Sequence, residues 1–101
     1  MALTRRQQRQ LRTLAHRRQP VVRLGQRGLT QAVLDETEAA LGHHELIKVR
    51  LNAGDRQTRS ATATVLCQHT GAELVQLIGR VAILYRRHPE APVIALAGAE
   101  D

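Results

Sequence analysis

Three segments of the chain repeat their apolar residues with the period of an α-helix. They cover residues 4–16, 30–41 and 56–69, and each has one apolar and one polar side. Gly42 and Gly71 follow the second and third segments, and glycine is typical of the left-handed residue that ends a helix. The residues predicted to face inward on the first and third helices are Leu11, Leu14, Ala15, Ala61, Val65 and Leu66.

Four shorter segments have the composition of strands. They are residues 20–24, 45–51, 74–78 and 81–86. In the second of them apolar residues alternate with Lys48 and Arg50, as in a strand with one buried face. Gly79-Arg80 between the last two strands suits a type II′ turn. The order α-β-α-β-α-β-β predicts an α/β (α+β) fold in which helices pack on a four-stranded mixed sheet.

The length of 101 residues predicts one domain with one modest core. We expect this domain to span residues 1–97 and to be followed by a short tail at 98–101. After residue 86 the chain contains Pro89 and Pro92 and then a short apolar run at 93–96. That run predicts either an edge strand or a disordered segment.

Positive charge is concentrated in the first third of the chain. The formal net charge is +6, and residues 1–34 contain eight arginines and no acidic residue. A localised basic surface of this kind is typical of a protein that binds a polyanion. The other interpretation is a solvated charge run in an arginine-rich genome, because fourteen of the fifteen basic residues are arginine.

Aromatic residues are nearly absent, which narrows the kinds of nucleic-acid binding to consider. Tyr85 is the only one in the sequence. This argues against domains that stack bases on aromatic platforms, such as RRMs and many OB-folds. Tyr85 itself either packs its ring in the core or stacks on a single base.

A glycine-bracketed loop, Gly25-Gln26-Arg27-Gly28, lies between a predicted strand and a predicted helix. Glycines lack side chains, so a phosphodiester backbone can approach the main chain closely. Exposed amide groups and the positive end of the following helix favour phosphate oxygens, and Arg27 adds a charged donor. KH domains clamp nucleotides with such a loop. Two glycines three apart also occur in ordinary turns, so the motif alone is weak.

Several stretches together resemble one family. They are Leu14-Ala15-His16, residues 20–30, residues 43–49 and residues 75–86. In this order and spacing they resemble the CRM domain (chloroplast RNA splicing and ribosome maturation) in its stand-alone bacterial YhbY-like form. The resemblance implies a fold like the C-terminal domain of a translation initiation factor, and RNA binding through the glycine loop. It also implies association with precursors of the large ribosomal subunit.

We therefore predict an RNA-binding protein that contacts ribosomal RNA in large-subunit precursors, mostly through phosphates and shape. The alternative is a ribosome-assembly adaptor that binds proteins through its sheet. No membrane, cofactor or small-molecule substrate is expected. The predicted RNA-binding residues are Gly25, Gln26, Arg27, Gly28, Arg5, Arg9, Arg12, Arg17, Arg18, Arg23, Lys48 and Arg50.

Other candidate chemistry does not converge on a site, so no enzyme is predicted. His43 and His44 would leave opposite faces of a strand, and no cysteine cluster completes a zinc site. Glu36 is expected to pair with Lys48 rather than to act in catalysis. The single cysteine, Cys67, predicts a buried, inert thiol in a reducing compartment, and hence a cytoplasmic protein.

Overall fold

The computed structural model describes residues 2–52 and 54–98. The predicted order of elements is confirmed. The elements are α1 (Arg5–Ala15), β1 (Val22–Arg23), α2 (Gln31–His44), β2 (Leu46–Arg50), α3 (Arg56–Thr70), β3 (Glu73–Ile78) and β4 (Val81–Tyr85). None of the helices in the described ranges is long and apolar enough to cross a membrane.

The four strands form one mixed sheet in the order β1-β2-β4-β3. β1 pairs with β2 in parallel, so α2 connects them as a crossover, and β4 runs antiparallel to both of its neighbours. β1 contributes only two residues, with Val22 opposite Val49. In the β3–β4 turn Gly79 has a φ of +55°, as the first central residue of the predicted type II′ turn requires.

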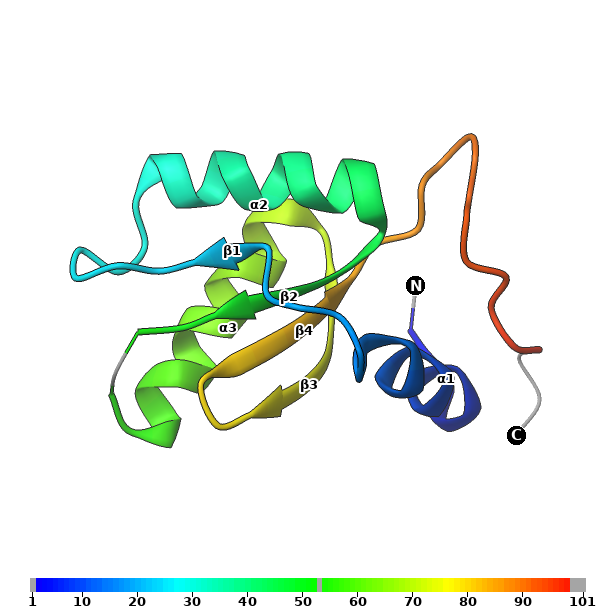
Figure 1. The fold of residues 1–101 in the computed structure, drawn as a ribbon, viewed down its shortest axis with the longest axis horizontal. Coiled ribbons are helices and arrows are strands. Elements are labelled where there is room, and N and C mark those ends of the chain that lie inside the picture. Colours follow the sequence, from blue (N-terminus) through cyan, green and yellow to red (C-terminus); the bar gives the residue numbers. More distant parts are fainter. Residues whose placement is uncertain (1, 53, 99–101) are drawn as a thin grey trace.

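The sheet separates two hydrophobic cores, because successive side chains of a strand point to opposite faces. α2 and α3 cover one face and pack on residues such as Val49 and Leu84. α1 covers part of the other face and packs on Leu46, Ile83 and Tyr85 (Figure 1). The ring of Tyr85 is buried there, so packing, and not base stacking, is its role.

Local signals set the helix starts as predicted. Thr4 caps α1 in a reciprocal capping box with Gln7, and Thr30 and Asp55 cap α2 and α3. α3 ends at Gly71 with a φ of +73°. Each cap satisfies main-chain groups that would otherwise lack a partner at a helix end.

The prediction that Gly42 ends the second helix was wrong. α2 continues through His43 and His44, and its C-cap is Glu45, with a φ of +65°. A positive φ is unfavourable for a residue with a side chain. The carboxylate of Glu45 compensates for it by binding the C-terminal segment, as described below. The two histidines therefore lie on a helix and not on a strand.

The segment after β4 is neither an edge strand nor disordered. Its carbonyl oxygens at Ala95 and Ala97 accept hydrogen bonds from Gln10 and Gln7 of α1, at 2.7 and 2.9 Å. Ile94 and Leu96 pack against the core beneath α1. The segment thus packs along one side of α1. Of the predicted tail 98–101, residues 99–101 lie outside the described residues.

Three predicted inward residues are on the surface. Leu14, Ala61 and Val65 are exposed, whereas α3 buries Ala63, Leu66 and Thr70. Leu14 lies near the end of α1, beside the fully buried Ala15, and is 41% exposed. The burial of Thr70 is possible because its hydroxyl donates to the carbonyl of Leu66 at 2.7 Å.

Candidate nucleic-acid interface

The glycine loop (Gly25–Gly28) connects β1 to α2 at one end of the molecule's longest dimension, which measures 40 Å (Figure 1). Gly28 N donates to Gly25 O at 3.0 Å, so Gln26 and Arg27 occupy the two central positions of a β-turn. Both side chains are exposed. The N–H of Gly28 is used inside the turn and is not available to a phosphate.

The two glycines of the loop differ in what the protein itself requires of them. Gly28 has a φ of +67°, and a Cβ there would lie 3.4 Å from Asn52 Nδ2. The backbone of Gly25 lies outside the left-handed region, and a Cβ there would meet no atom within 4 Å. Folding therefore explains the glycine at position 28 but not the one at position 25.

Further polar and cationic residues surround the loop. A hollow of about 510 Å³ lies beside it and is lined by Gly25, Gln26, Arg50, Asn52 and Arg80. These residues meet because the ends of β1 and β2 and the start of β4 share one edge of the sheet. The Leu51 N–H, bonded to Arg80 O at 2.6 Å, fixes the β3–β4 turn against this edge. Sequence reasoning missed Arg80 and Asn52, because only the strand register brings them to the loop.

The sheet carries three more predicted cations on the face that α1 partly covers. Leu46 packs under α1, so Lys48 and Arg50, two and four residues on, point to the same face. Arg23 is the register partner of Arg50 and shares that face. Arg23 and Arg50 are exposed, and Lys48 is half-buried, with its Nζ 3.4 Å from His16 O. The expected Lys48–Glu36 pair is therefore replaced by this bond.

Arg5, Arg9 and Arg12 of α1 are exposed, but they do not lie beside the glycine loop. α1 and the glycine loop are at opposite ends of the sheet (Figure 1). Arg5, Arg9 and Arg12 all face solvent, and Arg17 follows just after the helix. The cations of the sheet lie between these arginines and the loop. Together with the cations at the loop end of the sheet, they form a surface that we call the basic strip: Arg5, Arg9, Arg12, Arg17, Lys48, Arg23, Arg50, Arg27 and Arg80.

Arg18, another predicted RNA-binding residue, also has an internal partner. The guanidinium of Arg18 donates to Leu46 O at 2.6 Å and is only partly exposed. Its position ties the α1–β1 connection to β2. We therefore assign Arg18 a structural role and leave it outside the basic strip.

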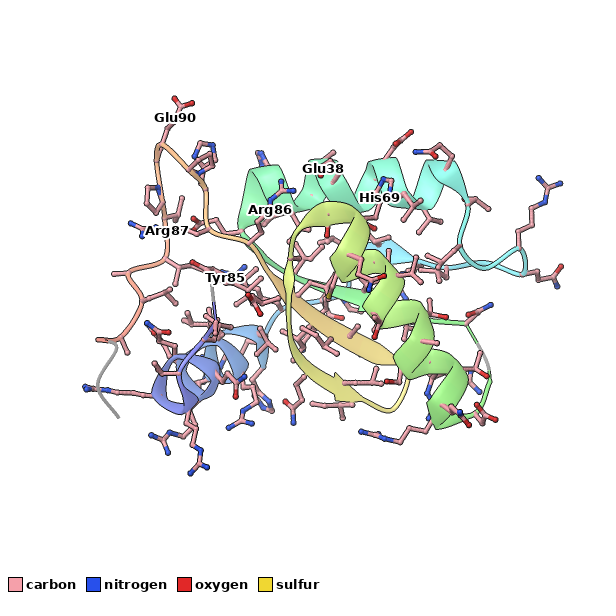
Figure 2. All side chains as sticks on the ribbon, turned by 180° about the vertical axis from the view of Figure 1, so that it is seen from behind. Glu38, His69, Tyr85, Arg86, Arg87 and Glu90 are labelled. Atoms are coloured by element: carbon pink, nitrogen blue, oxygen red, sulfur yellow. The ribbon has the colours of Figure 1, made fainter. Side chains whose placement is uncertain are left out.

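Arg86 also serves the fold. Its guanidinium lies 2.6 Å from the Glu38 carboxylate and 2.9 Å from Thr70 O, and so joins β4 to α2 and α3 (Figure 2).

The remaining candidate chemistry has a structural explanation. Burial, and secondarily the charge of Glu73, raises the pKa of Cys67 to about 11, so its thiol is protonated and unreactive at neutral pH. In the two described ranges, no group of three or more histidine, cysteine or acidic residues is placed to hold a metal ion. His43 and His44 contact each other edge to face, with ring centroids 4.6 Å apart.

The fold and this surface define a small α/β protein with a cationic face that ends in a glycine loop. Residues 3–86 match the CRS1 / YhbY (CRM) domain, and the chain belongs to that family. This confirms the resemblance seen in the sequence.

Named relatives cover nearly the whole chain. One is a protein from Pseudomonas aeruginosa named as a probable RNA-binding protein, 43% identical over 90 residues, which are 89% of this chain and 86% of that one. Another is an RNA-binding protein from Haemophilus influenzae, 45% identical over 91 residues, which are 90% and 92% of the two chains.

A solved structure agrees with the fold. The solution structure of a hypothetical protein from Staphylococcus aureus, proposed there to bind RNA, matches with a TM-score of 0.83 and 33% identity. The match covers 95% of this chain and 100% of that one.

Proposed function

We propose that this chain is an RNA-binding protein, and not an enzyme, that grips phosphates with the glycine loop and the basic strip. The observation that carries the proposal is the loop end of the sheet. Arg50 and Arg80 line the hollow there, and Arg27 is part of the loop itself. Gly25 has no side chain, although the fold leaves room for one. A close approach by a ligand backbone is a reason for that glycine. The relatives named as RNA-binding proteins support the same ligand.

The contacts are mostly to phosphates and to RNA shape, with little reading of base edges. Arginine suits this role because its guanidinium can form two parallel hydrogen bonds with a phosphate. Tyr85, the only Phe, Tyr or Trp residue of the chain, has a buried ring, so it offers no platform for a base. The binding unit in this proposal is residues 1–97, because the segment up to Ala97 is bonded to α1.

The finer target we propose is ribosomal RNA in precursors of the large subunit, in the cytoplasm. It rests on the family, whose sequence pattern implies that association, and on the single cysteine, which fits a reducing compartment. Crosslinking the protein to RNA in cells and sequencing the attached fragments tests this target. Reads spread over messenger RNA without enrichment of large-subunit sequences would refute it.

The salt dependence of RNA affinity tests phosphate binding itself. If four to six cations of the basic strip meet phosphates, log K falls against log salt with a slope of roughly −3 to −5. The alternative function, an adaptor that binds proteins through the sheet, predicts no such dependence for RNA. A slope near zero would therefore favour the adaptor.

A further inference from the structure

α1 covers only one end of its sheet face, and the uncovered part forms a groove. The groove has a volume of about 790 Å³. α1 and the turn after it form one wall with Arg12 and Arg17, and β2 contributes Lys48. The floor consists mainly of Ile78, Val81 and Ile83 from β3 and β4, and Gln76 of β3 is a polar residue beside them.

The pairing register of β3 and β4 brings apolar side chains together on this floor. Ile78 is the partner of Val81 across the β3–β4 pair, and Ile83 lies two residues further along β4. All three point to the α1 face, but α1 reaches only as far as Ile83, which is buried. Ile78 is left 54% exposed and Val81 half-buried. The open face thus has cations over β1 and β2 and apolar side chains over β4 and β3.

We propose that this groove binds unpaired nucleotides of an RNA, with the bases on the apolar floor and the phosphates on the flanking cations. The inference rests on the proposed function and extends it from the loop to the far end of the basic strip. The faces of a nucleobase are weakly polar and its backbone is anionic, so one unpaired nucleotide needs an apolar floor beside a cationic wall. This groove supplies both within one space.

The size and charge of the groove select this occupant. Its volume lies in the range of about 300–1,000 Å³ typical of sites for small ligands, which suits one or two nucleotides but not a duplex. A duplex keeps its bases stacked inside and would leave the apolar floor unused. Among the described residues that line the groove no carboxylate occurs, and the basic strip extends beyond the groove in both directions. That length fits a continuous polyanion better than a short acidic segment of a protein.

Two RNA hairpins with equal numbers of phosphates test the inference by fluorescence anisotropy at one salt concentration. One has a fully paired stem, and the other carries a three-nucleotide bulge in its stem. We expect the wild-type protein to bind the bulged hairpin about 4- to 15-fold more tightly, which corresponds to burying one or two methylene groups. The double variant Ile78→Thr, Val81→Thr keeps β-branched residues in the strands and should bind both hairpins equally.

Val65→Thr is the matched control, because Val65 is 44% exposed on α3, beyond the opposite face of the sheet. It should keep the wild-type preference. Circular-dichroism melting establishes that each variant is folded. If the double variant does not fold, the single change Ile78→Thr at the more exposed position replaces it and should reduce the preference.

The possible outcomes separate this inference from the proposed function. Equal binding of both hairpins by the wild type, with a steep salt slope, would leave the proposed function intact and overturn the groove. A preference that survives in the folded variant would also overturn it. Failure to bind either hairpin would refute the proposed function itself. Tighter binding of poly-glutamate than of the bulged hairpin, lost in the variant, would assign the groove to an acidic protein segment.

Discussion

Glu45 joins the end of α2 to the C-terminal segment, and replacing it with glutamine measures how much this link stabilises the fold. The Glu45 side chain is 1% exposed. Its Oε2 accepts the N–H of His88 at 2.8 Å, and its Oε1 accepts those of Val93 and Ile94 at 2.9 and 2.8 Å. A glutamine has one carbonyl oxygen, so it can serve Val93 and Ile94, but its NH₂ group would face the His88 N–H.

The expected loss of stability follows from that geometry. A hydrogen bond to a charged acceptor contributes about 1.5–3 kcal/mol, and the part-buried His88 N–H would be left without its partner, so we expect a loss of about 2–3 kcal/mol. In a domain of this size each kcal/mol lowers Tm by about 4–8 °C. Thermal unfolding at pH 7 should therefore show a Tm roughly 8–24 °C below that of the wild type. Glu36→Gln, the same change at an exposed site of α2, should cost no more than about 0.5 kcal/mol.

The pH dependence gives a second check on Glu45. Burial raises the pKa of this carboxyl, but the N–H groups of His88, Ile94 and Val93 lower it more, so it lies below its ordinary value of 4.5. A depressed pKa stabilises the fold above the unfolded-state pKa, and this contribution is lost as the pH falls through the folded-state pKa. The gap between wild type and Glu45→Gln should thus shrink in acid. Equal Tm values at pH 7, or a gap that stays constant into strong acid, would refute the reasoning.

Three further predictions concern the two glycines of the loop and the buried Tyr85. Gly25→Ala should leave stability unchanged or raise it by about 0.4–1 kcal/mol while weakening RNA binding, because its methyl group meets only the ligand. Gly28→Ala should instead cost about 1–2 kcal/mol of stability through its left-handed backbone, and urea titrations of both variants compare the two. The buried Tyr85 hydroxyl finds no hydrogen-bond partner among the described residues, so Tyr85→Phe should be neutral or stabilising in the same titration. A loss above about 1 kcal/mol would show that this hydroxyl has a partner after all.

Local signals made much of the fold predictable. The side chains of Thr4 and Asp55 accept hydrogen bonds from backbone N–H groups three residues further on, and Gly71 ends α3 through its own left-handed backbone. Because these signals are local, the sequence alone located these helix ends. Gly42 misled the prediction because the true end of α2 depends on Glu45, whose partners lie 43 to 49 residues further along the chain. No local pattern reveals a contact of that range.

In the candidate site, too, the local features could be predicted from the sequence and the long-range contacts could not. The glycine loop and the arginines of α1 are visible in the sequence because they are contiguous or follow the helical period. Arg80 was missed because only the strand register brings it to the loop, and Arg18 was misassigned because its carbonyl partner on β2 depends on the folded chain. The loop and α1 lie apart because of where α1 packs on the sheet. Helical periodicity predicts which side of α1 is buried, but not what it packs against.

The measurement that tests the central claim most directly is RNA binding by the double variant Gln26→Asp, Arg27→Asp. It places two carboxylates at the central positions of the exposed turn and removes one guanidinium. Gln68→Asp with Arg87→Asp is the control, because it changes the same residue types and the same net charge at exposed positions outside the glycine loop and the basic strip. Both proteins should keep the wild-type Tm within the effect of about 0.5 kcal/mol typical of surface changes. The loop variant should lose about 2–4 kcal/mol of binding to ribosomal RNA, or roughly 30- to 1,000-fold, and the control much less. A folded loop variant that binds as tightly as the control would contradict the account.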